Sequence, residues 1–117
     1  MDRQGNDTAF TRDDLYGTKA EPTYAGALSF MRRKYSRDLE GVDVVVTGVP
    51  LDTATTHRPG ARFGPRGIRA ASSGLAWESP YGMPFDPFDK LAVIDYGDCF
   101  FDHGRPESVP DLSLIHI

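Results

Sequence analysis

The chain has 117 residues, of which 39% are hydrophobic, and its 13 basic and 17 acidic residues give a formal net charge of -4. No run approaches the roughly 18 consecutive apolar residues of a membrane span, and the amino terminus lacks the apolar stretch of a secretory signal. The acidic balance argues against nucleic acid as a partner, because phosphate binding needs a basic surface. We therefore expect a cytoplasmic protein with no membrane or nucleic-acid partner, whose single cysteine, Cys99, forms no internal disulfide.

The first part of the chain offers little regular pattern. Residues 1–23 are mostly polar and show neither helical nor strand periodicity, so we expect an extended arm. From Tyr24 to Arg37, apolar residues recur every four positions, which predicts a short helix or a helical turn. The basic cluster Arg32–Lys34 on this helix favours a solvated face or a subunit contact over an anion or membrane site.

Residues 42–50 predict the clearest strand. They contain four valines within five positions, and β-branched side chains on both faces are typical of a parallel strand covered on both sides by helices. A loop of unusual length follows, and loops of this length are uncommon unless they are functional. Gly64-Pro65 then predicts the start of a helix, since proline is tolerated in the first turn.

The predicted helix would bury an apolar stripe formed by Ile68, Ala71 and Leu75. A segment rich in proline and aromatic residues, 77–89, leads to a second strand over Lys90–Tyr96. Two strands joined by a loop and a helix make a βαβ unit, so the fold class we expect is α/β with a parallel sheet.

Polar side chains follow both predicted strands, where ligands bind in open α/β sheets. The candidates are Asp52, Thr53, Thr55, Thr56, His57 and Arg58 after the first strand, and Asp98, Cys99, Asp102 and His103 after the second. Asp98, Asp102 and His103 are of metal-ligand type. Their spacing fits no compact site, which favours the alternative that Asp98 caps backbone N–H groups while the other two face water.

The remaining candidates have structural interpretations as well. Four arginines, Arg58, Arg62, Arg66 and Arg69, surround the predicted helix start, where an anion could bind to free N–H groups. The segment Gly60–Gly64 matches neither phosphate-loop pattern, so structural ion pairs across a subunit contact are the stronger interpretation. Cys99 has no fixed basic partner, which favours a packed thiol over a nucleophile.

Three stretches together resemble the N-terminal part of agmatinases, which belong to the arginase-like ureohydrolases. These are Gly48–Asp52, then Thr55–Ser72 with the core pattern G-x-R-x-G-P-x-x-I-R, and then Leu91–Asp98. The resemblance covers residues 22–110, and it implies a three-layer arginase-like α/β fold with a parallel sheet, of which this chain holds the N-terminal portion.

The resemblance also implies a chemistry. In the family, a hydroxide bridging two Mn2+ ions attacks the guanidinium carbon of a small linear substrate, and agmatine yields urea and putrescine. It further implies a homo-oligomer, in which the arm and the basic helix contact neighbouring subunits. The loop after the first strand would border the substrate entrance, with Thr55, Thr56, His57 and Arg58 as its entrance residues.

The family's three metal-binding motifs, Gly-Gly-Asp-His, Asp-Ala-His-x-Asp and Asp-x-Asp-x-x-Asp-Pro, do not occur in this sequence. We therefore assign no metal ligand and no catalytic residue to this chain, and we expect it to be inactive alone. The expected division is an arm over 1–23, a truncated ureohydrolase domain over 24–110, and a tail over 111–117 that does not resemble the family.

Other functions stay open at this point. A sister guanidino hydrolase, guanidinobutyrase or guanidinopropionase, would share the same N-terminal pattern. The chain could instead serve as a non-catalytic interaction module, or as a small anion-binding domain built on the Gly60–Gly64 helix start.

Overall fold

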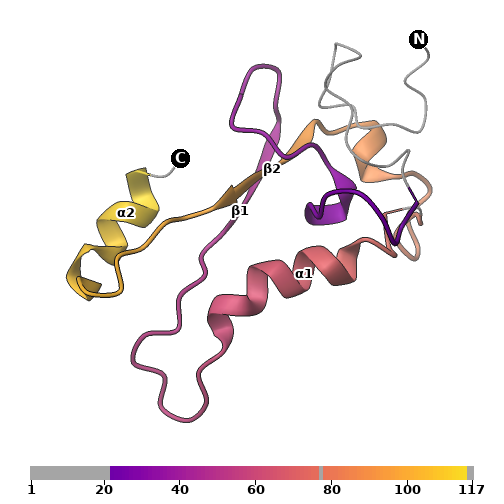
Figure 1. Ribbon diagram of the computed structural model, residues 1–117. Coiled ribbons are helices and arrows are strands. Elements are labelled where there is room, and N and C mark those ends of the chain that lie inside the picture. Colours follow the sequence, from indigo (N-terminus) through magenta and orange to yellow (C-terminus); the bar gives the residue numbers. More distant parts are fainter. Residues whose placement is uncertain (1–21, 77, 116–117) are drawn as a thin grey trace.

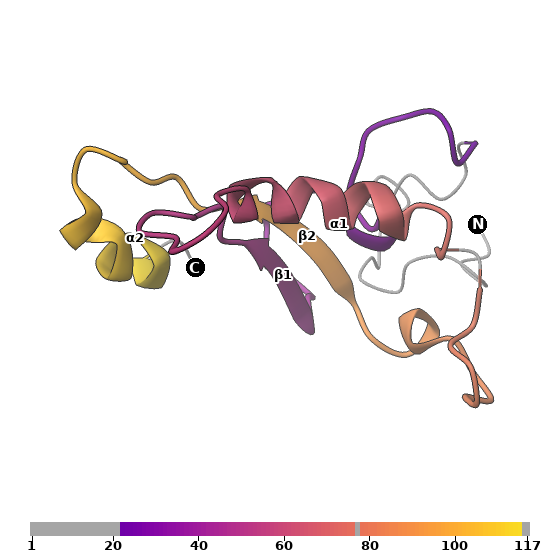
Figure 2. The ribbon, with the colours of Figure 1, turned by 90° about the horizontal axis from the view of Figure 1, so that it is seen from below.

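The two valine-rich segments form the parallel strands that the sequence predicts. The computed structural model describes residues 22–76 and 78–115, so most of the expected arm lies outside the described residues. Strands β1 (Val44–Gly48) and β2 (Val93–Asp98) pair in parallel, and helix α1 (Gly64–Ser72) connects them along one face (Figures 1 and 2). The α/β class and the βαβ unit are confirmed.

Short helical turns and one further helix complete the described part. The 3-10 turns span Phe30–Arg32, Ala61–Phe63, Pro87–Asp89 and Pro106–Ser108, and helix α2 spans Val109–Ile115. Helix α2 begins directly after the 3-10 turn Pro106–Ser108. Within residues 22–76 and 78–115, no helix combines the length and the apolar character needed to cross a bilayer.

The strand pairing contains one irregularity, which lies in β2. Val46 pairs with Asp95 and Thr47 with Gly97, so Tyr96 is an extra residue on the β2 side. Gly97 has a φ of 84°, and a Cβ at this position would meet the Tyr35 hydroxyl. A glycine is therefore required at this bulge, both by its backbone conformation and by the close side chain.

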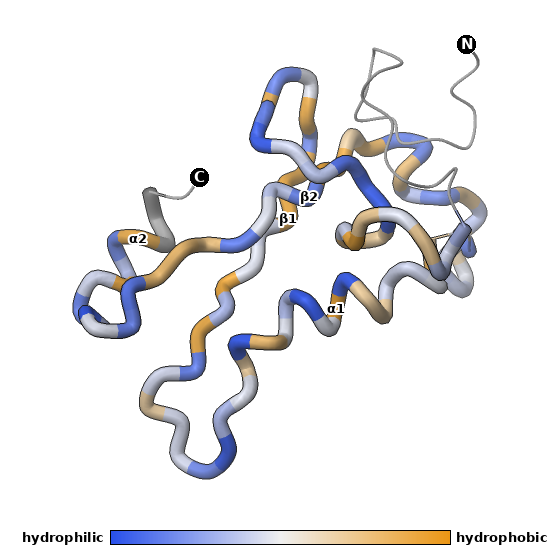
Figure 3. The backbone as a smooth tube through the Cα atoms, in the orientation of Figure 1, coloured by the Kyte–Doolittle hydropathy of each residue, from blue (hydrophilic) through white to orange (hydrophobic). Residues whose placement is uncertain are grey.

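Alternation along the strands gives the sheet two different faces. Ile94 and Tyr96 of β2 form the buried apolar cluster with Ala92, and Val42 and Val45 pack against it. The hydropathy colouring shows apolar residues along both strands (Figure 3). The neighbouring residue, Asp95, faces α1 instead, so the helix meets the sheet through a charged side chain.

Helix α1 begins at the predicted Gly64-Pro65, but the prediction of its buried stripe is wrong. Ile68, Ala71 and Leu75 are exposed, whereas the buried residues of the helix are Arg69 and Ser72. The physical reason is the carboxylate of Asp95, which is buried and must be paired. Arg69 and Ser72 lie three residues apart, and so share the helix face that turns toward it.

The segment 24–37 forms a single helical turn, Phe30–Arg32, which is the shorter of the two forms that the sequence predicts. Met31 and Arg32 have positive φ values of 50° and 57°, because the backbone here bonds to distant groups. The N–H of Phe30 donates to Asp95 Oδ2 at 2.7 Å, and that of Met31 donates to Ser72 Oγ at 2.9 Å. These tertiary hydrogen bonds replace the helical ones.

The prediction that Arg32–Lys34 forms a solvated face or a subunit contact is also wrong for its two arginines. Arg32 and Arg33 are 2% and 0% exposed. The Arg33 guanidinium lies 4.3 Å from the centre of the Phe88 ring, and its Nε donates to the Met31 carbonyl at 3.0 Å. The two side chains therefore belong to the interior of this chain.

The contact between β1, β2 and α1 predicts opposite effects at two glycines. A Cβ on Gly48 would lie against Asp98 Oδ1 and 2.7 Å from Pro65 Cβ, whereas one on Gly67 meets nothing within 4 Å. We expect Gly48→Ala to lower the free energy of unfolding by about 1–3 kcal/mol. Gly67→Ala, inside α1, should raise it by about 0.5–1 kcal/mol. Urea unfolding followed by far-UV circular dichroism measures both, and equal effects of the two variants would contradict this account.

Candidate functional site

A cavity of about 420 Å³ lies at the carboxyl ends of β1 and β2, the edge at which the sequence predicts a ligand site. Its lining residues come from the two strand ends, from the base of the loop after β1, and from α1. They are Pro50, Arg62, Phe63, Arg66, Asp98, Cys99, Phe100, Phe101 and His103. The cavity therefore combines aromatic walls with charged side chains of both signs.

Behind this cavity, the buried carboxylate of Asp95 is fully hydrogen-bonded. Oδ2 accepts from the Phe30 N–H at 2.7 Å and from Arg69 Nε at 2.6 Å. Oδ1 accepts from Arg69 Nη2 and from the Gly97 N–H, both at 2.9 Å. The Arg69 contact is bidentate, which is the strongest arrangement between these two groups. Asp95 is 0% exposed, so all four donors replace water.

The ion pair fixes the charge state of both partners. Burial opposes ionisation of Asp95, but the hydrogen bonds from Arg69, Phe30 and Gly97 outweigh it and lower the pKa of this carboxyl group below its ordinary value. Hydrogen bonds to Asp95 and Asp98 raise the pKa of Arg69 above its ordinary value, against the effect of burial. Both groups are therefore ionised throughout the neutral range.

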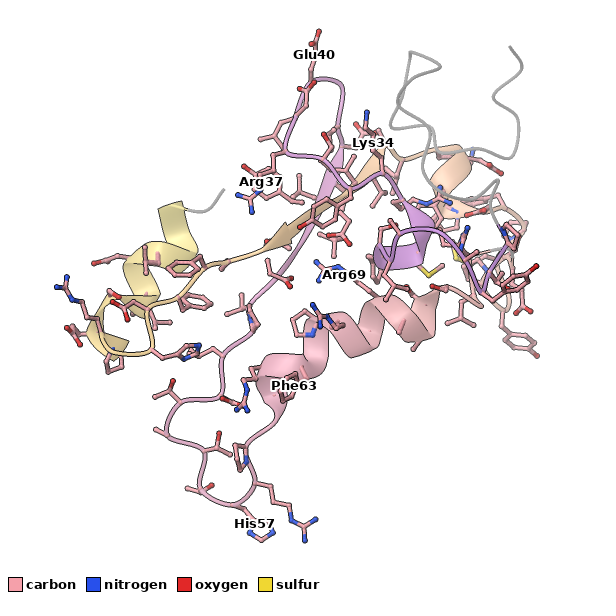
Figure 4. All side chains as sticks on the ribbon, in the orientation of Figure 1. Lys34, Arg37, Glu40, His57, Phe63 and Arg69 are labelled. Atoms are coloured by element: carbon pink, nitrogen blue, oxygen red, sulfur yellow. The ribbon has the colours of Figure 1, made fainter. Side chains whose placement is uncertain are left out.

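Arg69 also connects this interior pair to the cavity. Its Nη1 lies 2.8 Å from Asp98 Oδ1, and the Asp98 side chain is 35% exposed where it lines the cavity wall. Figure 4 shows Arg69 reaching from α1 toward the strands. The arginine therefore bridges a buried carboxylate and a carboxylate of the cavity wall.

The structure does not bring together the metal-type side chains after β2. Asp98 pairs with Arg69 rather than capping backbone N–H groups, and Asp102 accepts from the Gly104 N–H at 2.9 Å. Asp102 and His103 are exposed, as the solvent-facing interpretation predicts. Over residues 22–76 and 78–115, no group of three or more His, Cys, Asp or Glu side chains could hold a metal ion. The side chains of this described part therefore do not fit a metal centre.

The loop after β1 is ordered by Asp52. Its Oδ2 accepts from the Gly60 N–H at 2.7 Å and forms an ion pair with Arg62 Nη1 at 3.1 Å. Desolvation acts against ionisation, but the Gly60 and Arg62 N–H groups and the Arg62 guanidinium lower the pKa of Asp52 below its ordinary value. A single carboxylate thus closes the loop at its base, between residues 52 and 62.

The predicted entrance residues lie at the tip of this loop. Thr55, Thr56, His57 and Arg58 are all exposed, and none of them lines the strand-end cavity. Figure 4 places His57 at the end of the loop, away from both strands. Within the described part, the base of the loop, with Arg62 and Phe63, forms the cavity wall. A role for the four tip residues at a substrate entrance stays a prediction.

Arg62 and Arg69 do form structural ion pairs, but their partners Asp52, Asp95 and Asp98 belong to the same chain. The prediction that these arginines pair across a subunit contact is therefore wrong for these two residues. The packed-thiol interpretation of Cys99 is confirmed, because this residue is buried and makes no disulfide.

The sequence analysis did not identify Asp95, the buried carboxylate that pairs with Arg69 behind the cavity wall. The signal was present, since an aspartate between Ile94 and Tyr96 in an apolar strand must find a buried partner. It also missed the aromatic wall of Phe100 and Phe101, which follows directly after the second strand.

Comparisons with known proteins place this geometry in a family. Residues 42–116 match the model of the arginase family. The crystal structure of a hypothetical agmatinase from Burkholderia thailandensis superposes with a TM-score of 0.81 at 61% sequence identity, covering 94% of this chain and 35% of that one.

Two sequence relatives carry different names. An agmatinase of Chromobacterium violaceum is 58% identical over 110 residues, which are 94% of this chain and 34% of that protein. A human mitochondrial guanidino acid hydrolase is 48% identical over 73 residues, which are 62% of this chain and 20% of that protein. The chain therefore spans about a third of the length of the Chromobacterium violaceum and Burkholderia thailandensis proteins.

The buried ion pair predicts a large difference between two arginines of α1. Arg69→Met leaves the Asp95 charge buried and unpaired, so we expect the free energy of unfolding to fall by about 3–5 kcal/mol. Arg66→Met changes an exposed arginine of the same helix, and the expected change is within about 0.5 kcal/mol. Urea unfolding compares the two variants. A loss below about 1 kcal/mol for Arg69→Met would show that the pair is dispensable.

The lowered pKa of Asp95 predicts an acid-sensitive stability. A carboxylate with a folded-state pKa below its unfolded value of about 3.9 stabilises the fold above that pH, and its contribution is lost as the pH falls through the folded-state pKa. Above about pH 5, the free energy of unfolding of Asp95→Asn should therefore lie furthest below that of the parent. This difference in stability should become smaller as the pH falls. Urea midpoints from pH 7 to pH 2 test this, and a difference that is independent of pH would contradict it.

Proposed function

The chain belongs to the arginase family, and on that premise we propose that it forms part of an agmatinase-type ureohydrolase, which hydrolyses the guanidinium group of agmatine to putrescine and urea. The observation that carries the proposal is the match over 94% of the chain to a Chromobacterium violaceum agmatinase. The similarity to the Burkholderia thailandensis structure supports it as well. The cavity lies at the carboxyl edge of the strands, where α/β enzymes bind their ligands.

The proposed enzyme uses manganese, whose bound water supplies the nucleophile when the metal is present. The described residues offer no cluster that fits such a centre, so the proposal places the ligands outside them. What this chain contributes is a wall of the cavity and its support. Arg69 holds Asp98 in place, while Asp52 fixes the base of the loop that carries Arg62 and Phe63. By this proposal the 117-residue chain is inactive alone.

A guanidino acid hydrolase is the second candidate, and the human relative of that name supports it. Such an enzyme would act on the same guanidinium group with a different tail on the substrate. A cytoplasmic location is proposed as well, with the free thiol of Cys99 consistent with a reducing compartment. Assembly into a homo-oligomer stays a prediction of the sequence resemblance.

Urea release by the full-length product of the same locus tests the proposed activity. We expect manganese-dependent release of urea from agmatine, with little from 4-guanidinobutyrate or 3-guanidinopropionate. Removal of the metal with a chelator should abolish it, and added manganese should restore it. Turnover of a guanidino acid without turnover of agmatine would move the assignment to the second candidate. Absence of urea from all three compounds would remove the hydrolase assignment.

A further inference from the structure

Among the described residues, one arginine that lines the strand-end cavity has no structural partner. Arg62 and Arg66 both line this cavity of about 420 Å³. The Arg62 guanidinium is paired with Asp52 at 3.1 Å and lies 4.6 Å from the centre of the Phe63 ring, so its position is fixed. The side chain of Arg66 is exposed and makes no ion pair, hydrogen bond or ring contact with residues 22–76 or 78–115. Within this part of the chain, Arg66 is therefore available to a ligand.

The carboxylates beside the cavity are paired with other arginines. Asp98 is the acidic residue among those that line the cavity, and its Oδ1 lies 2.8 Å from Arg69 Nη1. Asp52 stands behind the wall and holds Arg62. Neither carboxylate forms an ion pair with Arg66, so the positive charge of Arg66 remains for an anion from outside the chain.

A guanidinium group suits a carboxylate, because its planar fork donates two parallel hydrogen bonds to the two oxygens. The interior of this chain already uses that geometry, where Arg69 holds Asp95 by two bonds of 2.6 and 2.9 Å. Arg66 offers the same fork to the cavity. The Arg62 side chain, which is 45% exposed, brings a second guanidinium to the same site.

The aromatic walls of the cavity favour an organic anion over an inorganic one. Phe63 and Phe100 line the cavity and are 61% and 82% exposed. An alkyl chain attached to the carboxylate would cover part of these rings, whereas a bare inorganic ion would leave them in water. The cavity volume also lies within the range of about 300–1,000 Å³ that is typical of sites for small molecules.

We propose that the strand-end cavity holds a subsite for a small aliphatic carboxylate, in which Arg66 binds the carboxylate and the aromatic walls contact the alkyl chain. Arg62 is the second cation of this carboxylate subsite. Agmatine carries a cation at each end, so neither of its ends is expected against Arg66, and the carboxylate subsite takes a ligand other than that substrate. The contacts that define the subsite all lie within this chain, and they are independent of the proposed activity.

Titration of the 15N-labelled chain with sodium butyrate tests the carboxylate subsite. We expect the amide NMR signals of Cys99, Phe100 and Phe101 to move together and to saturate, with a dissociation constant in the millimolar range. Arg66→Gln should weaken binding by about five-fold or more, because a charge-assisted contact is lost. Arg58→Gln removes the same charge from the exposed loop tip, away from the cavity, and should change the affinity by less than about two-fold. Equal weakening by the two variants would overturn the proposal.

Two further probes separate the contribution of the charge from that of the alkyl chain. Inorganic phosphate carries negative charge without an alkyl chain, and it should bind at least about five-fold more weakly than butyrate. Butylamine has the same alkyl chain with the opposite charge, and it should give no saturable shift of the same signals. Butylamine binding as tightly as butyrate would overturn the role of Arg66. Phosphate binding as tightly as butyrate would overturn the assignment to an organic acid.

Calorimetry on the full-length product of the same locus repeats the butyrate titration with Arg66→Gln and Arg58→Gln, so the outcome does not depend on the behaviour of the 117-residue chain alone. We expect the same order of affinities. Absence of butyrate binding by the full-length product would overturn the carboxylate subsite. Release of urea from agmatine without butyrate binding would leave the proposed function in place, whereas butyrate binding without urea release from any guanidino compound would support the subsite and remove the proposed function.

Discussion

The carboxylate of Asp95 is the point on which this structure depends. A buried charge is tolerated only when its hydrogen-bonding capacity is filled, and here α1, the Phe30 turn and the β2 bulge each supply donors. Each donor fixes the position of the element that carries it. The orientation of α1 and the positions of the Phe30 N–H and the Gly97 N–H therefore all meet the one requirement of this carboxylate.

Local sequence signals were enough for the strands, the βαβ order and the start of α1, because valine runs and a Gly-Pro pair act over a few residues. These local signals failed where a contact with a residue far along the chain determines which side chains are buried. The spacing of apolar residues predicted that the Ile68 side chain is buried. It did not predict the burial of Arg69, because the partner of Arg69 lies 26 residues further along the chain. The segment around Phe30–Arg32 stays a single turn for the same reason, because the N–H groups of Phe30 and Met31 bond to β2 and α1.

For the candidate site, the sequence indicated the edge of the sheet at which the cavity lies, but not the residues that line this cavity. The polar residues at the tip of the loop after β1 were predicted to border the substrate entrance. In the structure, the base of the loop lines the cavity instead, because the ion pair with Asp52 holds Arg62 there. The spacing of residues along the sequence could not show that Asp98 forms an ion pair with Arg69. The metal-binding motifs of the family are absent from the sequence, and the described residues form a supported wall with no metal cluster of their own.

The separation of these partners along the chain also sets the order of events during synthesis. Phe30 and Asp95 are 65 residues apart, and ribosomes add roughly 5–20 residues per second, so the turn at Phe30 waits roughly 3–13 s for its acceptor. β1 and α1 are synthesised within that interval, so the valines of β1 first lack β2 beside them and Arg69 of α1 first lacks its partner Asp95. The valines of β1 can therefore be covered by β2 only when translation has passed residue 98, about 50 residues after β1 itself ends.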